Sequence, residues 1–473
     1  MSDRLRNALA ALLLVAAPAA TASPKRTLPE LIELAHARAR SIAVAKGELE
    51  VREAQKSEAL RLWAPSGDFT YLLTGAPDIN CQAPLADNFL SSAQLGGLTP
   101  SQLRQRDCTS TVDPNGNTIS VLNPNFHGVG MQLDLKITQP LYTFGKIEHA
   151  IAAAGHGVAA GRAGLDVARN ELDLQVARAY WGLKATRTSL ATLDDVRGEL
   201  LPWVKKIELD IDTAKPQFNS SDLHRIKIAL GSLEEIAADI TKTQAIAAGG
   251  LFALFGEPIE IDDAELDPGD TVERPIEWYR NEALVHRPEV KQLDEGVAAL
   301  RSLALARRAQ MLPNLALVGG ISWRYTSSNI EDSQSAYDNH ANYFGFGLYL
   351  ALEQPLDFVE KFAQLRHAHA DAELLSAQQR LAVAGIGFEV DQAWAGLVEA
   401  RDRVQLSEKL QREARGWLSQ VQQNLDLGTE EPRNLIEAAR AYFEQRLRYY
   451  QAIFDVNVAT AQLRRATGVD VAR

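Results

Sequence analysis

This chain of 473 residues contains few cysteines and few methionines, and it has no excess of positive charge. Its 2 Cys exclude a disulfide-stapled scaffold, because such domains pack many cysteines into a short chain. Asp and Glu number 61 against 49 Lys and Arg, a net charge of −12, so nucleic acid is not expected as a partner. The P-loop, Gly-x-Ser-x-Gly and His-Glu-x-x-His motifs are absent from the sequence. We therefore expect no enzyme activity, no cofactor and no metal site.

Long apolar runs are also scarce, and the clearest one stands at the N-terminus. Arg4 and Arg6 precede an apolar stretch at 8–17, and the alanines at 20 and 22 suit cleavage. We interpret residues 1–22 as a secretory signal peptide. No run of 18 apolar residues follows, so no membrane-spanning helix is expected in the mature chain. An exported protein of this kind is periplasmic, secreted, or a β-barrel of the outer membrane.

What the chain does contain is an internal repeat. Gln139-Pro140 recurs as Gln354-Pro355, an offset of 215 residues (354 − 139). Upstream, Pro65 matches Pro313 at an offset of 248 residues (313 − 65). The first copy therefore holds 33 more residues than the second between these landmarks (248 − 215).

These landmarks predict two copies of one unit, each in the order helix, strand, strand, long helix, helix. The expected parts are a signal peptide at 1–22, a first repeat at 23–260, a linker at 261–274 and a second repeat at 275–473. Strands are expected at about 67–73 and 129–138, around a loop at 74–128, and at about 315–325 and 343–353. Cys81 and Cys108 both lie in that loop, and in an oxidising compartment we expect them to form a disulfide.

The predicted strands alternate apolar and polar residues. Segment 129–138 has the period and about the length of a transmembrane β-strand, although a half-buried strand of a soluble sheet shows the same period. Aromatic residues gather near one end of the second hairpin, where an interfacial girdle would lie: Trp323, Tyr325, Tyr343 and Phe344. Four strands are too few to close a membrane barrel, so we expect a barrel shared between chains, and three chains supply 12 strands.

The predicted helices carry apolar residues at seven-residue spacing, as in Leu165, Leu172 and Ala179. Segment 144–209 is predicted as one helix of 66 residues, about 99 Å long at the usual rise. The helices predicted at 27–63 and 216–251 hold 37 and 36 residues. Two shorter helices stacked end to end would therefore pair along one long helix.

The order and spacing of these elements resemble the TolC-like outer-membrane efflux proteins. The resemblance covers essentially the whole mature chain. It rests on the duplicated unit and on short motifs that are each weak alone: Gln139-Pro-Leu-Tyr-Thr-Phe-Gly-Lys146, Leu312-Pro313-Asn314, Leu427-Gly428-Thr429, Leu254-Phe255-Gly256 and Ala466-Thr467-Gly468. The strand-to-helix junction residues are Gln139, Pro140, Gln354 and Pro355.

The resemblance implies a mainly α-helical fold with a small β part, assembled as a homotrimer. Three copies would form a 12-stranded outer-membrane β-barrel continued by a 12-helix periplasmic α-barrel. Such a protein is the exit duct of a tripartite efflux pump or a type I secretion system and catalyses nothing. Its implied partners are a periplasmic adaptor, an inner-membrane transporter and outer-membrane lipid.

The family closes its periplasmic end with charged and polar residues at the helix turns, so the resemblance also implies gate residues. The candidates here are Asp222, Glu430, Asn434 and Glu437. The family pattern Gly-Thr-Arg followed by two Asp reads Gly428-Thr429-Glu430 here, followed by Asn434 and Glu437, so its arginine is missing. Rings of acidic residues would attract cations. The other interpretation is that these are solvated turn residues, with Asp222 and Asn434 as helix N-caps.

Two other functions fit parts of the sequence. A soluble periplasmic coiled-coil adaptor or scaffold would explain the heptads and the signal peptide, but not two hairpins with apolar alternation. An exported hydrolase on a helical scaffold would lack any catalytic constellation. A channel of the outer membrane would require detergent for extraction, whereas the scaffold and the hydrolase would not.

Overall fold

The computed structural model describes residues 25–78, 110–112, 118–120, 125–213, 219–269, 274–327 and 342–469. This part of the chain is mainly helical with a small antiparallel sheet, which confirms the coarse fold class predicted from the sequence. The signal peptide, Cys81, Cys108 and most of the loop 74–128 lie outside the described residues. The disulfide therefore stays a prediction.

The chain divides into two compact units. We call the first the helical unit, which comprises Met1–Gln55, Ala154–Ala299 and Asp371–Arg473. The second, the sheet unit, comprises Lys56–Ala153 and Leu300–Ala370. Both units draw on both sequence repeats, so the contact units and the repeats divide the chain differently.

Each repeat begins with two short helices where the sequence predicted one. They are α2 (Leu28–Arg38) and α3 (Arg40–Arg61) in the first repeat, and α7 (Ile276–His286) and α8 (Pro288–Ala309) in the second. The break falls at Ala39, whose backbone is extended, and at the equivalent Arg287. In the second repeat Pro288 explains the break, because a proline disfavours helical backbone at the residue before it. The first repeat breaks at the same place without a proline.

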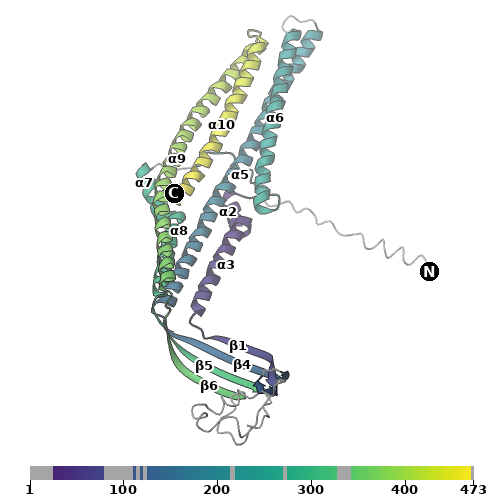
Figure 1. Ribbon diagram of the computed structural model, residues 1–473. Coiled ribbons are helices and arrows are strands. Elements are labelled where there is room, and N and C mark those ends of the chain that lie inside the picture. The colour runs from purple at the N-terminus through teal and green to yellow at the C-terminus, as the bar shows by residue number, and fades with distance from the viewer. Residues whose placement is uncertain are drawn as a thin grey trace, which may run out of the picture. The chain divides into compact units, whose positions relative to one another are not determined.

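Long helices follow in each repeat. They are α5 (Lys146–Asp212) and α6 (Ser220–Phe255), then α9 (Phe358–Asp426) and α10 (Pro432–Thr467). Figure 1 shows α5 beside α6 and α9 beside α10 as antiparallel hairpins. Both α6 and α10 end at a glycine in the left-handed region, Gly256 and Gly468, where a side chain would be strained.

The heptad residues form the core of these hairpins, as predicted. Ile207, Ile226, Leu425 and Leu435 are fully buried in one cluster with Phe443. Burying one such side chain contributes about 1.5–3 kcal/mol, so this cluster holds α5, α6, α9 and α10 together.

One described helix is apolar enough to cross a membrane on length and composition alone. An 18-residue window of α9 has a mean hydropathy of 1.2, and 22% of that window is buried. The sequence has no unbroken run of 18 apolar residues after residue 22, so the absence of a membrane-spanning helix stays a prediction. Buried core helices of soluble proteins also pass this test, so it is weak evidence of a span.

The sheet unit holds four antiparallel strands, shown side by side in Figure 1. They are β1 (Ser66–Asp78), β4 (Asn125–Tyr142), β5 (Asn314–Thr326) and β6 (Tyr343–Glu353), in the order β1-β4-β5-β6. Two short strands, β2 (Ser110–Val112) and β3 (Thr118–Ser120), pair separately.

The two hairpins of this sheet have the same register. Ser66 lies opposite Thr138 in the first repeat, and Asn314 lies opposite Glu353 in the second. The two pairs differ by the offsets read from the sequence, 248 on one strand (314 − 66) and 215 on the other (353 − 138). The duplication therefore holds at the level of single strand pairs.

The linker between the repeats is fixed to the helical unit by polar contacts. Tyr180 donates a hydrogen bond to Asp262 at 2.7 Å, and the buried Lys184 ammonium lies 3.2 Å from the same carboxylate. Asn457 accepts from the Gly269 backbone N–H at 2.9 Å. Burial, and then the Asp262 carboxylate, raise the pKa of Tyr180 well above its usual range, so the phenol keeps the proton that it donates.

Candidate functional site

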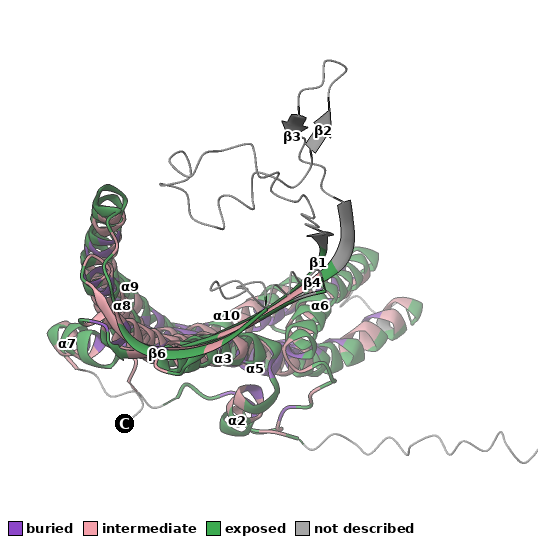
Figure 2. Cartoon of the chain, turned by 60° about the horizontal axis from the view of Figure 1, so that its bottom comes forward, coloured by how far each residue is buried: buried purple, intermediate pink, exposed green. Residues whose placement is uncertain are grey.

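The sheet unit presents one continuous apolar face. Cross-strand register brings Leu73 opposite Met131, Met131 opposite Tyr325, and Leu135 opposite Ile321. All of these belong to one set of alternating residues: 69, 71 and 73; 129 to 137; 315 to 325; and 344 to 352, taking every second position. Figure 2 shows β6 coloured as exposed along most of its length. An exposed apolar face of this size marks a surface that contacts something other than water.

The height of this face suits a bilayer. Strand β5 carries it from Leu315 to Tyr325, about 34 Å along the strand and about 24 Å along the membrane normal at a 45° tilt. At one end Trp323 stacks on Tyr325 with ring centroids 6.1 Å apart. Near the opposite end Tyr142 meets Phe144 edge to face at 4.6 Å. Aromatic residues at both ends are typical of the two interfaces of a membrane barrel.

The other face of the sheet is polar. Asp134 accepts a hydrogen bond from Ser322 at 2.6 Å across β4 and β5, and another from Gln132. Asp68 lies directly opposite Lys136, which places opposite charges on neighbouring strands. A sheet with an apolar face and a polar face can separate lipid from water.

The predicted junction glutamines make the same hydrogen bond in both repeats. In the first repeat the Gln139 side-chain amide donates to the backbone carbonyl of Trp63 at 2.9 Å. In the second, Gln354 donates to the carbonyl of Met311 at 2.9 Å. Each glutamine thus ties the end of a strand to the end of the preceding helix. Pro140 and Pro355 follow these glutamines, and each Gln side chain also donates to its proline's carbonyl at 2.9 Å.

The first junction also reaches across to the second repeat, which sequence reasoning missed. Lys146 donates to the Leu312 carbonyl at 2.7 Å and to the Asn314 side chain at 2.6 Å. Phe144 and Gly145 both have positive φ, 54° and 94°, and this tight turn precedes Lys146 at the start of α5. Partial burial lowers the pKa of Lys146 from its usual value.

The turn before α6 holds the first gate candidate. Asp222 is buried, with 6% of its surface exposed, and its carboxylate accepts from the Asn219 backbone N–H at 3.2 Å. The N-cap is Asn219, whose side chain accepts from the Ser221 and Asp222 N–H groups at 2.9 and 3.1 Å. Arg225 lies 3.5 Å from the Asp222 carboxylate. Asp222 is therefore the third residue of a capping box rather than the N-cap itself.

The turn before α10 holds the other three candidates. Asn434 donates a side-chain hydrogen bond to Glu430, and Arg433 pairs with Glu437 at 2.8 Å. The N-cap of α10 is Glu431, so Asn434, like Asp222, occupies the third helical position and not the cap. The Asn434 hydrogen bond lowers the pKa of Glu430 from its usual value of 4.5.

Each gate candidate thus has a partner on its own turn. Among the described residues, no hydrogen bond or ion pair joins Asp222 to Glu430, Asn434 or Glu437. The capping box was readable from Asn219-x-x-Asp222, and the ion pair from the four-residue spacing of Arg433 and Glu437. Within one chain these residues stabilise helix ends.

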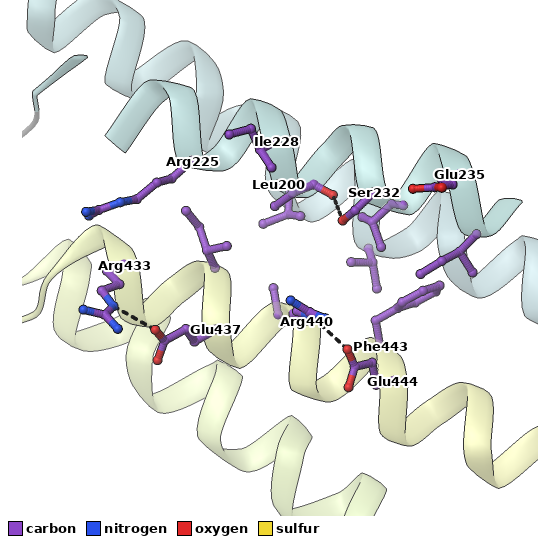
Figure 3. A pocket seen from close by; sticks show the side chains of 16 residues that line it. Leu200, Arg225, Ile228, Ser232, Glu235, Arg433, Glu437, Arg440, Phe443 and Glu444 are labelled. Carbon is purple, nitrogen blue, oxygen red and sulfur yellow. Dashed lines mark hydrogen bonds and ion pairs between the residues drawn. The ribbon is translucent and has the colours of Figure 1, made fainter. Parts of the chain in front are cut away.

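A pocket of about 700 Å³ lies between α6 and α10 beside these turns. Figure 3 shows Arg225 of α6 and Arg433 of α10 at one end of it, with the dashed pairs Arg433–Glu437 and Arg440–Glu444 along α10. Both pairs have N···O distances of 2.8 Å and are repeated seven residues apart. Leu200, Ile228 and Phe443 supply apolar lining, so the pocket combines an apolar floor with a charged rim.

Comparison with known proteins gives a family for part of the chain. Residues 279–469 match the family model described as outer membrane efflux protein. The second repeat is similar to outer membrane efflux proteins. This confirms the resemblance drawn from the sequence, together with the predicted location in the cell outer membrane with a periplasmic helical extension. No curated protein sequence matches the chain.

Solved structures of outer-membrane channels share the fold of the whole chain. The outer membrane protein VceC of Vibrio cholerae has 16% identity and a TM-score of 0.68, over 93% of this chain and 96% of that one. The CmeC channel of Campylobacter jejuni has 13% identity and a TM-score of 0.69, over 93% and 85%. The open state of the MtrE channel of Neisseria gonorrhoeae has 16% identity and a TM-score of 0.66, over 94% and 89%. At these identities the likeness establishes the fold, first repeat included.

Proposed function

We propose that this protein is the outer-membrane exit duct of a tripartite efflux pump or a type I secretion system. The observation that carries the proposal is the sheet with one exposed apolar face and one polar face. In a barrel the apolar face would contact lipid and the polar face would line an aqueous channel. The chain is then a passive conduit and catalyses nothing.

The duct is a homotrimer. A single chain supplies four strands, and β1 and β6 are the two edges of that sheet. Exposed edges with apolar side chains promote pairing with another chain. Three copies give 12 strands, which is within the range that closes a membrane barrel. The long helices of three copies form a periplasmic α-barrel of 12 helices.

The partners are a periplasmic adaptor and an inner-membrane transporter, which supplies the energy. The charged rim and apolar floor of the pocket between α6 and α10 suit contact with another helical protein, since helical partners dock through apolar anchors flanked by charges. A soluble coiled-coil scaffold, the other candidate, leaves the apolar face of the sheet without a role.

The periplasmic end is the gate, and Asp222, Glu430, Asn434 and Glu437 are its candidate residues. In a trimer each position would recur three times around the channel. Rings of carboxylates would attract cations and favour cationic cargo. Loss of both Asp222 and Glu437 to alanine is expected to raise leak conductance at low salt and to weaken cation selectivity. Unchanged conductance and selectivity would remove the gate assignment and leave the duct.

The deciding test is single-channel recording in a planar bilayer, with the mass of the detergent-purified protein measured in parallel. A trimer that gives discrete, small, cation-selective steps supports the duct with a closed acidic gate. A soluble monomer that gives no steps contradicts the barrel.

A further inference from the structure

The polar face of the sheet is arranged in rows that cross neighbouring strands. In one row Arg324 of β5 lies opposite Tyr343 of β6. In the next row Ser322 lies opposite Gly345, and Asp134 of β4 lies opposite Ser322. These positions alternate with the residues of the apolar face, so they belong to the polar side of the sheet. Tyr343 and Gly345 are thus consecutive members of one face of β6.

The ring of Tyr343 lies along β6 and covers Gly345. A side-chain carbon added to Gly345 would overlap the hydroxyl oxygen and the ring of Tyr343, and its three nearest atoms all belong to that side chain. The same addition at Gly347 would meet no atom within 4 Å. Gly345 is accordingly half-buried, whereas the residues on either side of it in β6 are exposed. The phenol therefore occupies the space of a side chain at position 345, which only glycine leaves empty.

This contact lies at the end of the sheet that is remote from the strand-to-helix junctions. Tyr343 begins β6, and the junction glutamine Gln354 follows the last residue of the same strand. Tyr343 keeps 49% of its surface exposed, so the ring that covers Gly345 still contacts the space in front of the polar face. In the proposed duct the polar face lines the channel, and this end of the sheet is its outer mouth.

We propose that Gly345 is a positioning residue, which lets the Tyr343 ring lie flat against the channel wall and so keeps the outer mouth of the duct open to bulky cargo. This inference rests on the proposed duct and adds to it a residue that limits the size of what passes. In a trimer three Tyr343 rings would lie at one level of the channel. The diameter of a pore and the groups that line it decide which solutes pass.

A side chain at position 345 would force the ring off the wall. Side chains of a strand stand roughly perpendicular to the sheet, so a displaced Tyr343 ring would point toward the channel axis. The direction toward β5 is taken by Arg324, which lies directly opposite Tyr343. Loss of this glycine is therefore expected to narrow the mouth at three points and to leave the rest of the wall unchanged.

A cysteine placed deeper in the channel tests the proposal. Gly320 lies on the polar face of β5, four residues and about 13 Å further along the strand than the residue opposite Tyr343. A side-chain carbon at Gly320 would meet its nearest neighbour at 3.8 Å, so Gly320→Cys fits there. A thiol reagent added from outside the cell has to pass the Tyr343 rings to reach this cysteine.

The comparison uses two membrane-impermeant thiol reagents, one small and one bulky. They are added to cells that make the full-length protein with Gly320→Cys, Cys81→Ser and Cys108→Ser. Gly345→Ala should slow the bulky reagent about tenfold relative to the small one, because the raised rings exclude only the bulky reagent. Gly347→Ala is the matched control, since the same substitution on the same face meets no atom and should leave the ratio of the two rates unchanged.

A rescue variant separates the ring from other effects of the substitution. Tyr343→Ala combined with Gly345→Ala should restore the reaction of the bulky reagent. An unchanged ratio in Gly345→Ala, or no rescue in the double variant, would overturn the positioning role and leave the duct standing. If Gly345→Ala lowers the amount of trimer measured by mass, recovery of the trimer in the double variant supports the same overlap, and loss in both overturns it. Failure of the small reagent to reach Gly320→Cys would contradict the duct itself.

Discussion

At the scale of single residues, the turns of this protein are built from side chains that stabilise their own helices. Asp222 completes a capping box with Asn219, and Arg433 pairs with Glu437 one helical turn away. These contacts join residues three or four positions apart, so they could be predicted from the sequence. The link from Lys146 to Leu312 could not, because it joins residues 166 positions apart and depends on how the two repeats meet.

Asp222→Ala is expected to loosen the first turn of α6. The substitution removes the acceptor for the Asn219 N–H and the partner of Arg225, and the loss of such a cap destabilises a helix by about 1 kcal/mol. Hydrogen exchange at residues 220–226 measures the effect. Glu437→Ala is the control, because its ion pair with Arg433 is exposed to solvent and contributes little to stability. Equal acceleration of exchange at the two turns would contradict the capping role.

Asn434→Leu is expected to remove an acid-sensitive contact from the turn before α10. The Asn434 amide lowers the folded-state pKa of Glu430 below 4.5, so this contact stabilises the turn above that pH. Its contribution is lost as the pH falls through the lower folded pKa. The protection of the turn against hydrogen exchange, measured relative to the intrinsic exchange rate at each pH, should therefore fall between about pH 5 and pH 3 in the wild type, with a smaller change in the variant. The same pH response in both proteins would exclude the Glu430–Asn434 pair as its source.

At the scale of elements, the periodicity of the sequence predicted the strands and the long helices. It did not predict which strands pair or where the first helix of each repeat breaks. Alternation at 129–138 predicted a strand, and β4 spans Asn125–Tyr142. Heptads predicted the long helices and their buried stripes. The break at Ala39 had no signal, because no proline or glycine stands there. That β4 pairs with β5 was also unreadable, since strands of different repeats carry the same alternation.

Neighbouring positions on β6 separate its two faces. Leu348→Arg places a charge on the apolar face and is expected to destabilise the membrane-inserted protein by about 2–4 kcal/mol if the position lies near the bilayer midplane. Gly347→Arg places the same charge on the polar face, where open space surrounds a side chain, and is expected to insert normally. Heat-modified gel mobility after refolding into vesicles measures insertion. Failure of both variants, or of neither, would contradict the assignment of the faces.

At the scale of the whole molecule, two sequence offsets describe most of the architecture. The offset of 248 relates α2 to α7, α3 to α8 and β1 to β5 with identical bounds, and together with the offset of 215 it relates the two hairpins in register. The candidate site was predicted less completely. The junction glutamines and the turn residues were identified from motifs, but whether the turn residues form a gate depends on contacts between copies, which one sequence does not encode in its local pattern.

The mature protein is expected to require detergent throughout purification. The apolar face of the sheet has no cover within the described chain, and a patch of this size promotes aggregation in water. Sedimentation of the membrane-extracted protein after detergent removal measures this, with re-addition of detergent as the control for reversible loss. A monodisperse soluble monomer in the absence of detergent would favour the scaffold alternative.

The pairing of β4 with β5 within one chain has a consequence for the rate of assembly. Its two strands belong to one chain, so they meet at an effective concentration of about millimolar that is independent of how much protein the cell makes. Strand pairing between copies of the chain forms only when separate chains collide. The rate of this assembly falls with the square or a higher power of the protein concentration. At low protein concentration, β1 and β6 would therefore stay unpaired for longer and remain accessible to proteases and chaperones. The level of expression, rather than the fold, would then set how long each chain stays vulnerable.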